Sequence, residues 1–189
     1  MNTNSLEIRN LLVEIQFNGA MYHGYQVQKN ALSITEVVQD TIEDLLHVRE
    51  AIVGCSRTDS GVHANSYFFN MKTALKIPIK KFVSIMNNAL PNDICVLSCC
   101  EVPQDFHARY DCVGKEYIYK IYNSERKNPF EARLSLHYKP HIDENLLNES
   151  AQQLVGTHDF TSFCSLGVKP GISMTKTVEY IKVYRENDF

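Results

Sequence analysis

Apolar residues recur at every second position from Leu11 to Phe17, and this alternation is typical of a half-buried strand. The strand ends at Asn18-Gly19, a pair that favours a turn. Ser33 and Glu36 then have the spacing of a capping box, and apolar residues follow at helical spacing as far as residue 46. The first part of the chain is therefore predicted to be a strand followed by a helix.

Three more strands and a second helix are predicted before residue 105. The strands cover 51–55, 67–73 and 94–102, and the helix begins after Pro78 and ends before Pro91. The order is β-α-β-β-α-β, which folds as four antiparallel strands with two helices on one face. We therefore expect residues 1–105 to form a ferredoxin-like unit.

The rest of the chain begins a second series of elements. The pattern predicts a strand over 117–121, a helix capped by Asp143 and a strand over 178–184. If this half repeats the first, residues 106–189 form an incomplete second α+β unit that shares the sheet. The fold class is then α+β, with tandem ferredoxin-like units and a mixed, mainly antiparallel sheet. The alternative is a complete, smaller α+β unit after residue 105.

Composition excludes several classes of protein. Hydrophobic residues make up 44% of the 189 residues and charged residues 22%, as in an ordinary soluble globular protein. No apolar run approaches the ~20 residues of a membrane span, and the first ten residues lack a secretory pattern. We therefore expect a cytoplasmic protein without a membrane partner. The six cysteines form no CxxC pair, so no metal site is expected.

The polar turn that joins the strands at 51–55 and 67–73 carries the candidate chemistry. Its residues are Cys-Ser-Arg-Thr-Asp-Ser-Gly-Val-His-Ala over 55–64, and they include Arg57 and Asp59. Asp-Ser-Gly after a strand is also an ordinary turn sequence, because Asp bonds the backbone that follows it and Gly tolerates positive φ. From the turn alone, the ordinary structural reading is favoured.

Four other motifs change this reading, and all five resemble the tRNA pseudouridine synthase A family over residues 8–184. The others are Tyr-His-Gly-Tyr-Gln-Val-Gln at 22–28, Phe-His-Ala-Arg at 106–109, Lys-Glu-Tyr-Ile-Tyr-Lys-Ile-Tyr-Asn at 115–123 and His-Asp-Phe-Thr-Ser-Phe at 158–163. The resemblance implies a pseudouridine synthase fold and isomerisation of uridine to pseudouridine in the anticodon stem-loop of tRNA. It also implies a homodimer that needs no cofactor and no metal.

The resemblance assigns Asp59 as the nucleophile, because Asp59 is the residue that matches the family's aspartate. A carboxylate nucleophile divides one difficult step into two easier ones, as it does in glycosidases. Attack at the sugar C1′, attack at the base C6 and promotion of ring-proton loss all remain open. Arg57 would keep Asp59 ionised and fill the gap left by the extruded base. The alternative for Arg57 is a plain ion pair with Asp59.

Other matched residues are candidate contacts. Tyr117 matches the family's substrate-contacting tyrosine, although its periodicity alone favours a core residue on a strand. Gln26 and Gln28 would brace the catalytic turn or bond the RNA backbone. Four further residues are candidates for contacts with phosphates: His63, His107, Arg109 and Lys115.

Two positions depart from the family's usual residues. Ser56 replaces a glycine, and its Cβ is tolerated only if the backbone there does not need positive φ. Tyr25 stands where tryptophan or phenylalanine is common. The family's later strand-helix segment also has no counterpart before Phe189, which makes a truncated, inactive fragment one alternative.

Two noncatalytic alternatives share the predicted order of elements. One is an RNA-binding module of the RRM type, but the strand over 63–72 lacks the basic-Gly-aromatic signature. The other is a ferredoxin-like regulatory or assembly domain, which does not need Asp59. The net charge of −3 argues against a large nonspecific RNA surface. Lysines and arginines are concentrated between 72 and 139, however, and would suffice for a local basic groove.

Overall fold

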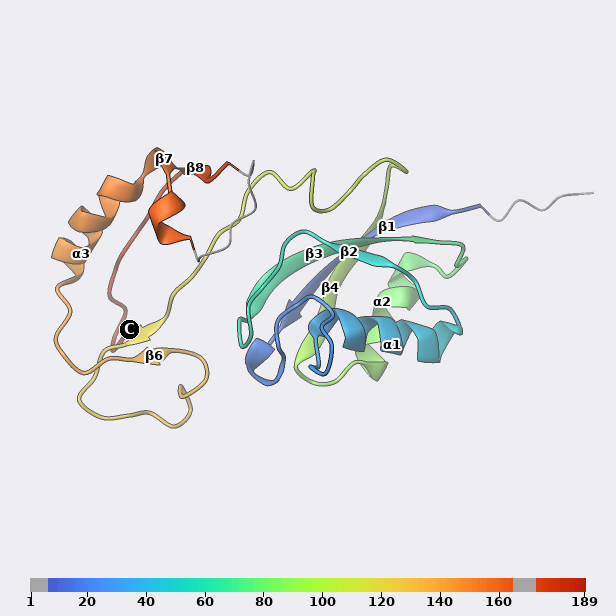
Figure 1. Ribbon diagram of the computed structural model, residues 1–189. Coiled ribbons are helices and arrows are strands. Elements are labelled where there is room, and N and C mark those ends of the chain that lie inside the picture. The colour runs from blue at the N-terminus through green and yellow to red at the C-terminus, as the bar shows by residue number, and fades with distance from the viewer. Residues whose placement is uncertain (1–6, 165–172) are drawn as a thin grey trace, which may run out of the picture. The chain divides into compact units, whose positions relative to one another are not determined.

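The computed structural model describes residues 7–164 and 173–189. The chain divides into two compact units, of which the first ends at Glu116 and the second begins at Tyr117 (Figure 1).

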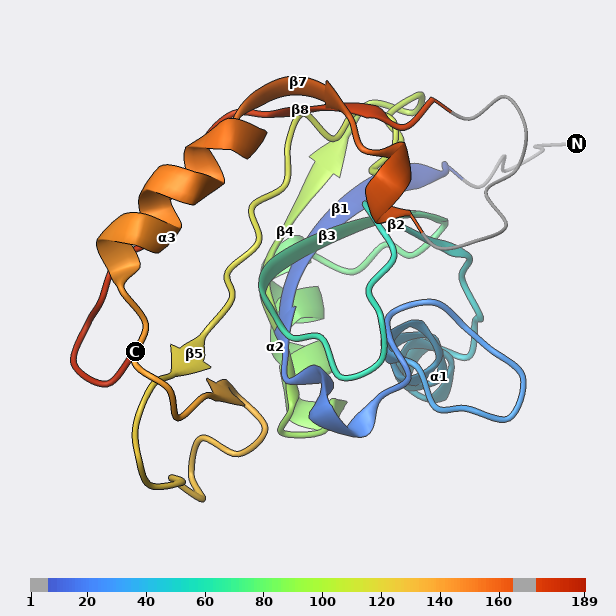
Figure 2. The same cartoon turned by 60° about the vertical axis from the view of Figure 1, so that its left-hand side comes forward.

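The first unit is a four-stranded antiparallel sheet with both helices on one face (Figures 1 and 2). Its elements are β1 (Arg9–Phe17), η1 (Gly19–Met21), α1 (Ile34–Leu46), β2 (Ile52–Gly54), β3 (Ala64–Thr73), α2 (Ile79–Ala89) and β4 (Ile94–Val102). The strand order is β2-β3-β1-β4, and β1 pairs with both β3 and β4. The β-α-β-β-α-β order predicted from the sequence is therefore present in this unit.

The hydrophobic core lies between the sheet and the helices. The buried positions of β1 face the helices beside their partners on β3, such as Val13 opposite Phe69 and Ile15 opposite Tyr67. Ile42 on α1 and Phe82 on α2 are buried in the same cluster. Because each fully buried apolar side chain contributes about 1.5–3 kcal/mol, this face accounts for much of the unit's stability.

The first unit extends further than the division at 105/106 predicted from the sequence. After β4 the chain is held against the sheet by two asparagines. Asn10 Nδ2 donates to Phe106 O at 3.0 Å, and Asn70 Oδ1 accepts from Ala108 N at 2.9 Å. These bonds join Phe106 and Ala108 to the sheet, and the first compact unit ends at Glu116.

The second unit has two short strand pairs and one α-helix. Its elements are β5 (Ile121–Tyr122), β6 (Leu136–His137), α3 (Glu144–Ala151), η2 (Gln152–Leu154), β7 (Gly156–Asp159), η3 (Thr161–Phe163) and β8 (Thr175–Val178). β5 pairs with β6 in parallel, and β7 pairs with β8 antiparallel. Asp143 caps α3 as predicted, because its Oδ1 accepts from the backbone of Asn145 and Leu146 at 3.0 Å each. The tandem arrangement with a shared sheet stays a prediction.

The strand predicted over 117–121 is wrong in extent. Residues 117–120 belong to no strand, and β5 begins only at Ile121. The ladder to β6 consists of two residue pairs. Alternation shows which side chains share a face, but a strand also needs a partner for its backbone.

The strand predicted over 178–184 is wrong for the same reason. β8 ends at Val178, where the predicted strand would begin. The following segment is bonded instead to side chains of the α3–η2 region. Gln152 Nε2 donates to Ile181 O at 3.0 Å, and Asn148 Oδ1 accepts from Val183 N at 2.9 Å. Side-chain amides thus take the place that a neighbouring strand would have.

Within the described part of the chain, no helix is long and apolar enough to cross a membrane.

Replacing Ser33 should destabilise the first unit. Ser33 is buried at the N-cap of α1, and its Oγ accepts from Glu36 N at 3.2 Å. Ser33→Ala removes this acceptor and should lower the free energy of unfolding by about 1 kcal/mol, measured by urea denaturation. Ser33→Gly is the matched control, since glycine at an N-cap loses only a few tenths of a kcal/mol. An alanine variant as stable as wild type would contradict the capping role.

Candidate active site

The candidate active site is the turn between β2 and β3, over residues 55–63. The chain leaves the sheet at Cys55, whose N–H donates to Phe68 O at 2.9 Å. It turns back on itself where Val62 N donates to Asp59 O at 3.2 Å and Gly61 has a φ of 79°. The side chains of Arg57 and Asp59 are exposed on this turn. A carboxylate is therefore presented to solvent from a closed backbone loop.

Tyr22 fixes the turn next to Asp59. Its carbonyl oxygen accepts from Gly61 N at 3.1 Å and from Ser60 Oγ at 3.3 Å. Its own ring is buried, and the hydroxyl donates to Asp93 Oδ1 at 2.7 Å. Burial, and then the bond to Asp93, raise the pKa of Tyr22, so the phenol stays protonated and keeps its donor. The residues after Asp59 thus rest on a loop that is itself anchored.

Gly24 allows the backbone before Asp59 to come close. Its φ is +86°, and a Cβ on it would lie 2.2 Å from Thr58 O. A side chain here would meet both a steric clash and a strained backbone conformation. The glycine of the motif at 22–28 is therefore required by the approach of this loop to the turn.

Tyr67 and Tyr25 support the other end of the turn. Their ring centroids are 4.2 Å apart in the core. The Tyr67 hydroxyl donates to Ser56 O and accepts from Ser56 N at 3.2 Å. Burial raises the pKa of both phenols, so Tyr67 remains a donor at neutral pH. A Cβ on Gly54 would lie 2.3 Å from the Tyr67 hydroxyl, which explains the glycine at the end of β2.

Ser56 stands where the family usually has glycine, and its side chain is tolerated only if φ at this position is not positive. Among the described residues other than glycine, those with positive φ are Asn30, His47 and Asn187. Ser56 is not one of them, so its Cβ introduces no backbone strain.

Of three further candidates from the sequence, His63 ends the turn, whereas Gln26 and Gln28 belong to the loop at 22–28. His63 Nδ1 accepts from Gly19 N at 3.2 Å, which ties the end of the turn to η1. Gln28 Nε2 donates to His23 O at 2.8 Å and so braces its own loop. Gln26 is exposed in that loop.

The alternative of an ion pair between Arg57 and Asp59 is not what the structure shows. The ion pairs found in residues 7–164 and 173–189 are Arg9–Glu101, Arg49–Asp40, Arg49–Glu43 and Arg185–Glu144. Neither Arg57 nor Asp59 takes part in these ion pairs, and both side chains are exposed.

The structure does not place His107 and Arg109 at the turn. Their segment follows β4 and is bonded at Asn70, whereas the turn returns to β3 at Ala64. The separation of Ala64 and Asn70 along the strand is roughly 20 Å at ~3.3 Å per residue. Lys115 is exposed further along the same segment.

Tyr117 begins the second unit and is not a core residue of a strand there. It lies outside the described strands, and 70% of its surface is exposed. Its ring is therefore accessible, as a substrate contact requires.

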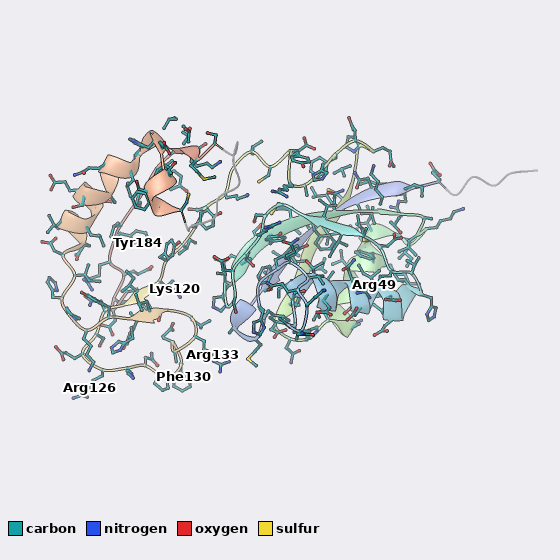
Figure 3. The ribbon with its side chains drawn as sticks, viewed as in Figure 1. Arg49, Lys120, Arg126, Phe130, Arg133 and Tyr184 are labelled. Carbon is teal, nitrogen blue, oxygen red and sulfur yellow. The ribbon has the colours of Figure 1, made fainter. Side chains whose placement is uncertain are left out.

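Basic and aromatic side chains are exposed on the second unit. Figure 3 labels Lys120, Arg126, Phe130 and Arg133 around the β5–β6 connection. Lys120 Nζ lies 5.1 Å from the centroid of the Phe189 ring, a cation–π contact that orients its charge. These cations contribute to the basic middle of the chain expected from the sequence.

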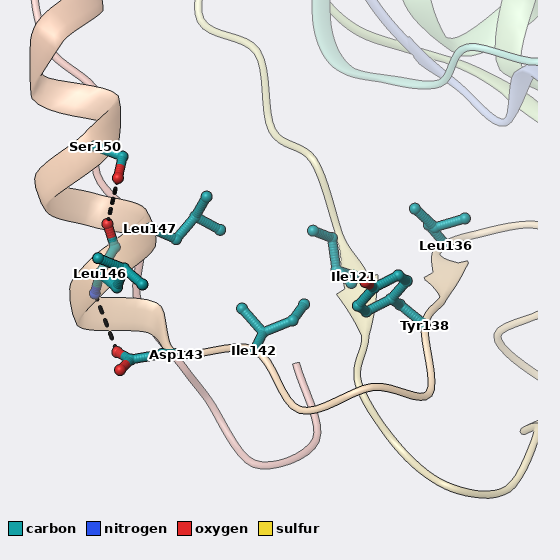
Figure 4. A pocket seen from close by; sticks show the side chains of 8 residues that line it. All are labelled: Ile121, Leu136, Tyr138, Ile142, Asp143, Leu146, Leu147 and Ser150. Atoms are coloured by element: carbon teal, nitrogen blue, oxygen red, sulfur yellow. Dashed lines mark hydrogen bonds between the residues drawn. The ribbon is translucent and has the colours of Figure 1, made fainter.

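The second unit also has an apolar pocket of about 460 Å³ (Figure 4). Its Asp143 carboxylate already caps α3, and its Ser150 hydroxyl donates to Leu146 O at 2.8 Å. The other lining residues are Ile121, Leu136, Tyr138, Ile142, Leu146 and Leu147. In the described residues no group of three or more potential ligands could hold a metal ion.

Sequence reasoning missed the residues that support the turn. Tyr22 lies inside the motif at 22–28, and this motif is the sequence signal that could have pointed to it. No sequence signal points to Asp93, because its role depends on a contact between two loops that are far apart in the sequence.

The first unit and its turn define a class: an α+β protein that presents a carboxylate from a braced loop beside a sheet. No protein-family model matches the chain. The chain is 37% identical over 182 residues to tRNA pseudouridine synthase A 2 of Clostridium tetani, which covers 95% of this chain and 73% of that relative. It therefore belongs to the tRNA pseudouridine synthase A family, a family of isomerases.

Two other relatives agree with this assignment. tRNA pseudouridine synthase A of Clostridium acetobutylicum is 40% identical over 162 residues, covering 86% of this chain and 66% of the relative. A Staphylococcus aureus protein of the same name is 40% identical over 155 residues, covering 82% and 59%. The chain thus spans less than two thirds of the length of these two relatives.

Removing the Tyr67 hydroxyl should loosen the turn. Tyr67→Phe leaves the Ser56 N–H and C=O without their partner, which should lower the free energy of unfolding by about 1–3 kcal/mol. Tyr110→Phe is the control, because its hydroxyl is on an exposed ring. Urea denaturation measures both, and hydrogen exchange at Ser56 should accelerate only in Tyr67→Phe. Unchanged exchange would show that the hydroxyl does not hold the turn.

Proposed function

We propose that this chain isomerises uridine to pseudouridine in the anticodon stem-loop of tRNA, with Asp59 as nucleophile. The observation that carries the proposal is the exposed carboxylate of Asp59 on a turn whose backbone is fixed on both sides. Membership of the family supports it, since the relatives are named as tRNA pseudouridine synthases. A turn with a merely structural role would not need this exposed carboxylate.

The chemistry requires a group that holds the substrate between two bond changes. The bond from C1′ to N1 breaks, the uracil rotates, and a bond from C1′ to C5 forms. The proton on C5 leaves and N1 gains one, so the isomerisation is balanced. Because oxidation states and composition do not change overall, the proposal requires no cofactor and no metal.

Asp59 serves as the holding group in either covalent route. Attack at C1′ gives a glycosyl ester, as in retaining glycosidases, and attack at C6 gives an adduct of the base. If ring-proton loss comes first, the same carboxylate acts as the base. Its exposure on the turn lets an extruded nucleoside reach it in all three cases.

Arg57 would act on the RNA. Its guanidinium belongs to none of the ion pairs found in the described residues, and it is exposed two positions before Asp59. A planar cation there can stack in the gap left by the extruded base and pair with phosphate. It can also favour the ionised form of a carboxylate within ~4–6 Å.

The other assignments complete the proposal. Tyr117 would lie against the extruded uracil, and its 70% exposure leaves the ring available. Lys115 would contact phosphate, and Gln26 and Gln28 would shape the loop beside the turn. A homodimer would form the tRNA cleft, and the protein would act in the cytoplasm.

Replacing the Asp59 carboxylate should abolish the reaction. Tritium released from C5 of labelled uridine in tRNA measures turnover. Asp59→Asn should lower it by on the order of a thousandfold or more, because an amide cannot form the adduct. Stability should not change, since the side chain is exposed.

The matched control is Asp105→Asn, another exposed carboxylate of the first unit. It should release tritium at the wild-type rate. Equal release by Asp59→Asn and wild type would end the assignment of Asp59. A wild-type chain that binds tRNA without releasing tritium would favour the noncatalytic RNA-binding alternative.

Removing the Tyr117 hydroxyl should affect catalysis more than folding. Tyr117→Phe keeps the ring but loses the group proposed to reach the polar edge of uracil. We expect kcat/KM to fall by about tenfold, the value of one hydrogen bond of ~1.4 kcal/mol, with an unchanged urea midpoint. A variant with the wild-type rate would refute the contact.

A further inference from the structure

Two buried asparagines hold a segment against the face of the sheet opposite the helices. Asn10 on β1 is 0% exposed and Asn70 on β3 is 4% exposed. Asn70 Nδ2 donates to Asn10 Oδ1 at 2.9 Å. Asn10 Nδ2 donates to Pro103 O at 2.9 Å and to Phe106 O at 3.0 Å. Strand side chains on this face would ordinarily be solvated.

The network satisfies both amides. Asn70 Oδ1 accepts from Ala108 N at 2.9 Å, and Asn70 Nδ2 has a second, longer contact with Phe106 O at 3.5 Å. Ala108 is itself buried. A buried polar network in which every member is paired specifies one geometry, because any displacement leaves a buried group unsatisfied. The segment from Pro103 to Ala108 is therefore fixed to the sheet.

The residues that follow form a closed turn over 107–111. His107 N donates to Asp111 Oδ2 at 2.7 Å, and His107 O accepts from the backbone of Tyr110 and Asp111 at 2.9 and 3.0 Å. His107 Nδ1 accepts from Arg109 N at 3.3 Å, which orients the imidazole. The turn is thus rigid as well as anchored.

This turn presents an aromatic pair, an exposed tyrosine and a half-buried histidine, beside a cation. The Tyr110 ring is 77% exposed and lies against the His107 ring, with centroids 4.3 Å apart and an interplanar angle of 32°. Arg109 between them in sequence is exposed. An exposed tyrosine in a fixed turn contributes little to folding, so its arrangement needs another explanation.

We propose that His107, Arg109 and Tyr110 form an RNA contact in which Tyr110 stacks on an unpaired base and Arg109 pairs with a backbone phosphate. Asn10 and Asn70 are its positioning residues. Proteins recognise unpaired RNA by stacking bases on aromatic rings and by pairing arginine with phosphate. The inference rests on the proposed function for its partner, tRNA, but not on Asp59. It differs from the catalytic turn, from which the segment is separated along β3.

Two substitutions at the exposed residues test the contact directly. The measurement is the Kd of the 189-residue chain for a tRNA transcript over a series of salt concentrations. Tyr110→Ala should weaken binding about tenfold, and Tyr110→Phe, which keeps the ring, should restore it. Arg109→Ala should reduce the slope of log K against log salt by about one, as loss of one phosphate contact does. The control Arg49→Ala removes one exposed charge beside α1, outside the basic stretch at 72–139, and should change the slope less.

Asn70→Leu tests the positioning role. It should weaken tRNA binding in the wild-type background and have no further effect in a Tyr110→Ala, Arg109→Ala background. A purely structural role would give the same loss in both. If Asn70→Leu does not fold, the variants at Tyr110 and Arg109 decide the inference, since both side chains are exposed.

The inference would be overturned if Tyr110→Ala and Arg109→Ala left the Kd for tRNA and its salt dependence unchanged. It would also be overturned if the chain bound a protein but no tRNA. Tritium release separates the two proposals. A chain that binds tRNA through this contact but releases no tritium supports the inference and rejects the proposed function. If the wild-type chain releases tritium and the Tyr110→Ala and Arg109→Ala variants bind tRNA with the wild-type Kd, the proposed function is supported and the inference is rejected.

Discussion

The turn at 55–63 keeps the Asp59 carboxylate exposed while its backbone is hydrogen-bonded to buried residues. The fixed backbone and the exposed side chain therefore belong to the same few residues. Tyr67 holds both polar atoms of the Ser56 backbone, and the carbonyl of Tyr22 holds Gly61 and the Ser60 hydroxyl. Asp59 lies between these two attachments. Both tyrosines belong to the buried core of the first unit.

The two attachments differ in what supports them. Tyr67 belongs to a strand, and its ring packs against Tyr25 and Phe17 within the core. Tyr22 belongs to a loop and depends on its hydrogen bond to Asp93. Packing is non-directional and tolerates small changes in shape, whereas a buried hydrogen bond needs one partner in one place. The attachment at Tyr22 is therefore the more specific of the two.

Periodicity predicted the first unit well because each of its elements has one apolar face and a partner within the same unit. It failed at 117–121 and 178–184 because alternation does not reveal whether a neighbouring strand exists. Asp59 could be singled out only through the resemblance, since Asp-Ser-Gly is otherwise an ordinary turn. Asn10 and Asn70 could not be singled out at all. Polar residues on the outer face of a strand are usually solvated, and these are buried by a segment much later in the chain.

The bond between Tyr22 and Asp93 has an evolutionary consequence. Asp93 lies in the connection between α2 and β4, whose backbone also accepts from Asn18 N at 2.8 Å. A phenol at position 22 makes an acceptor at position 93 selectively valuable, whereas a phenylalanine would release position 93 from that demand. The two positions should consequently drift as a pair among descendants of this sequence.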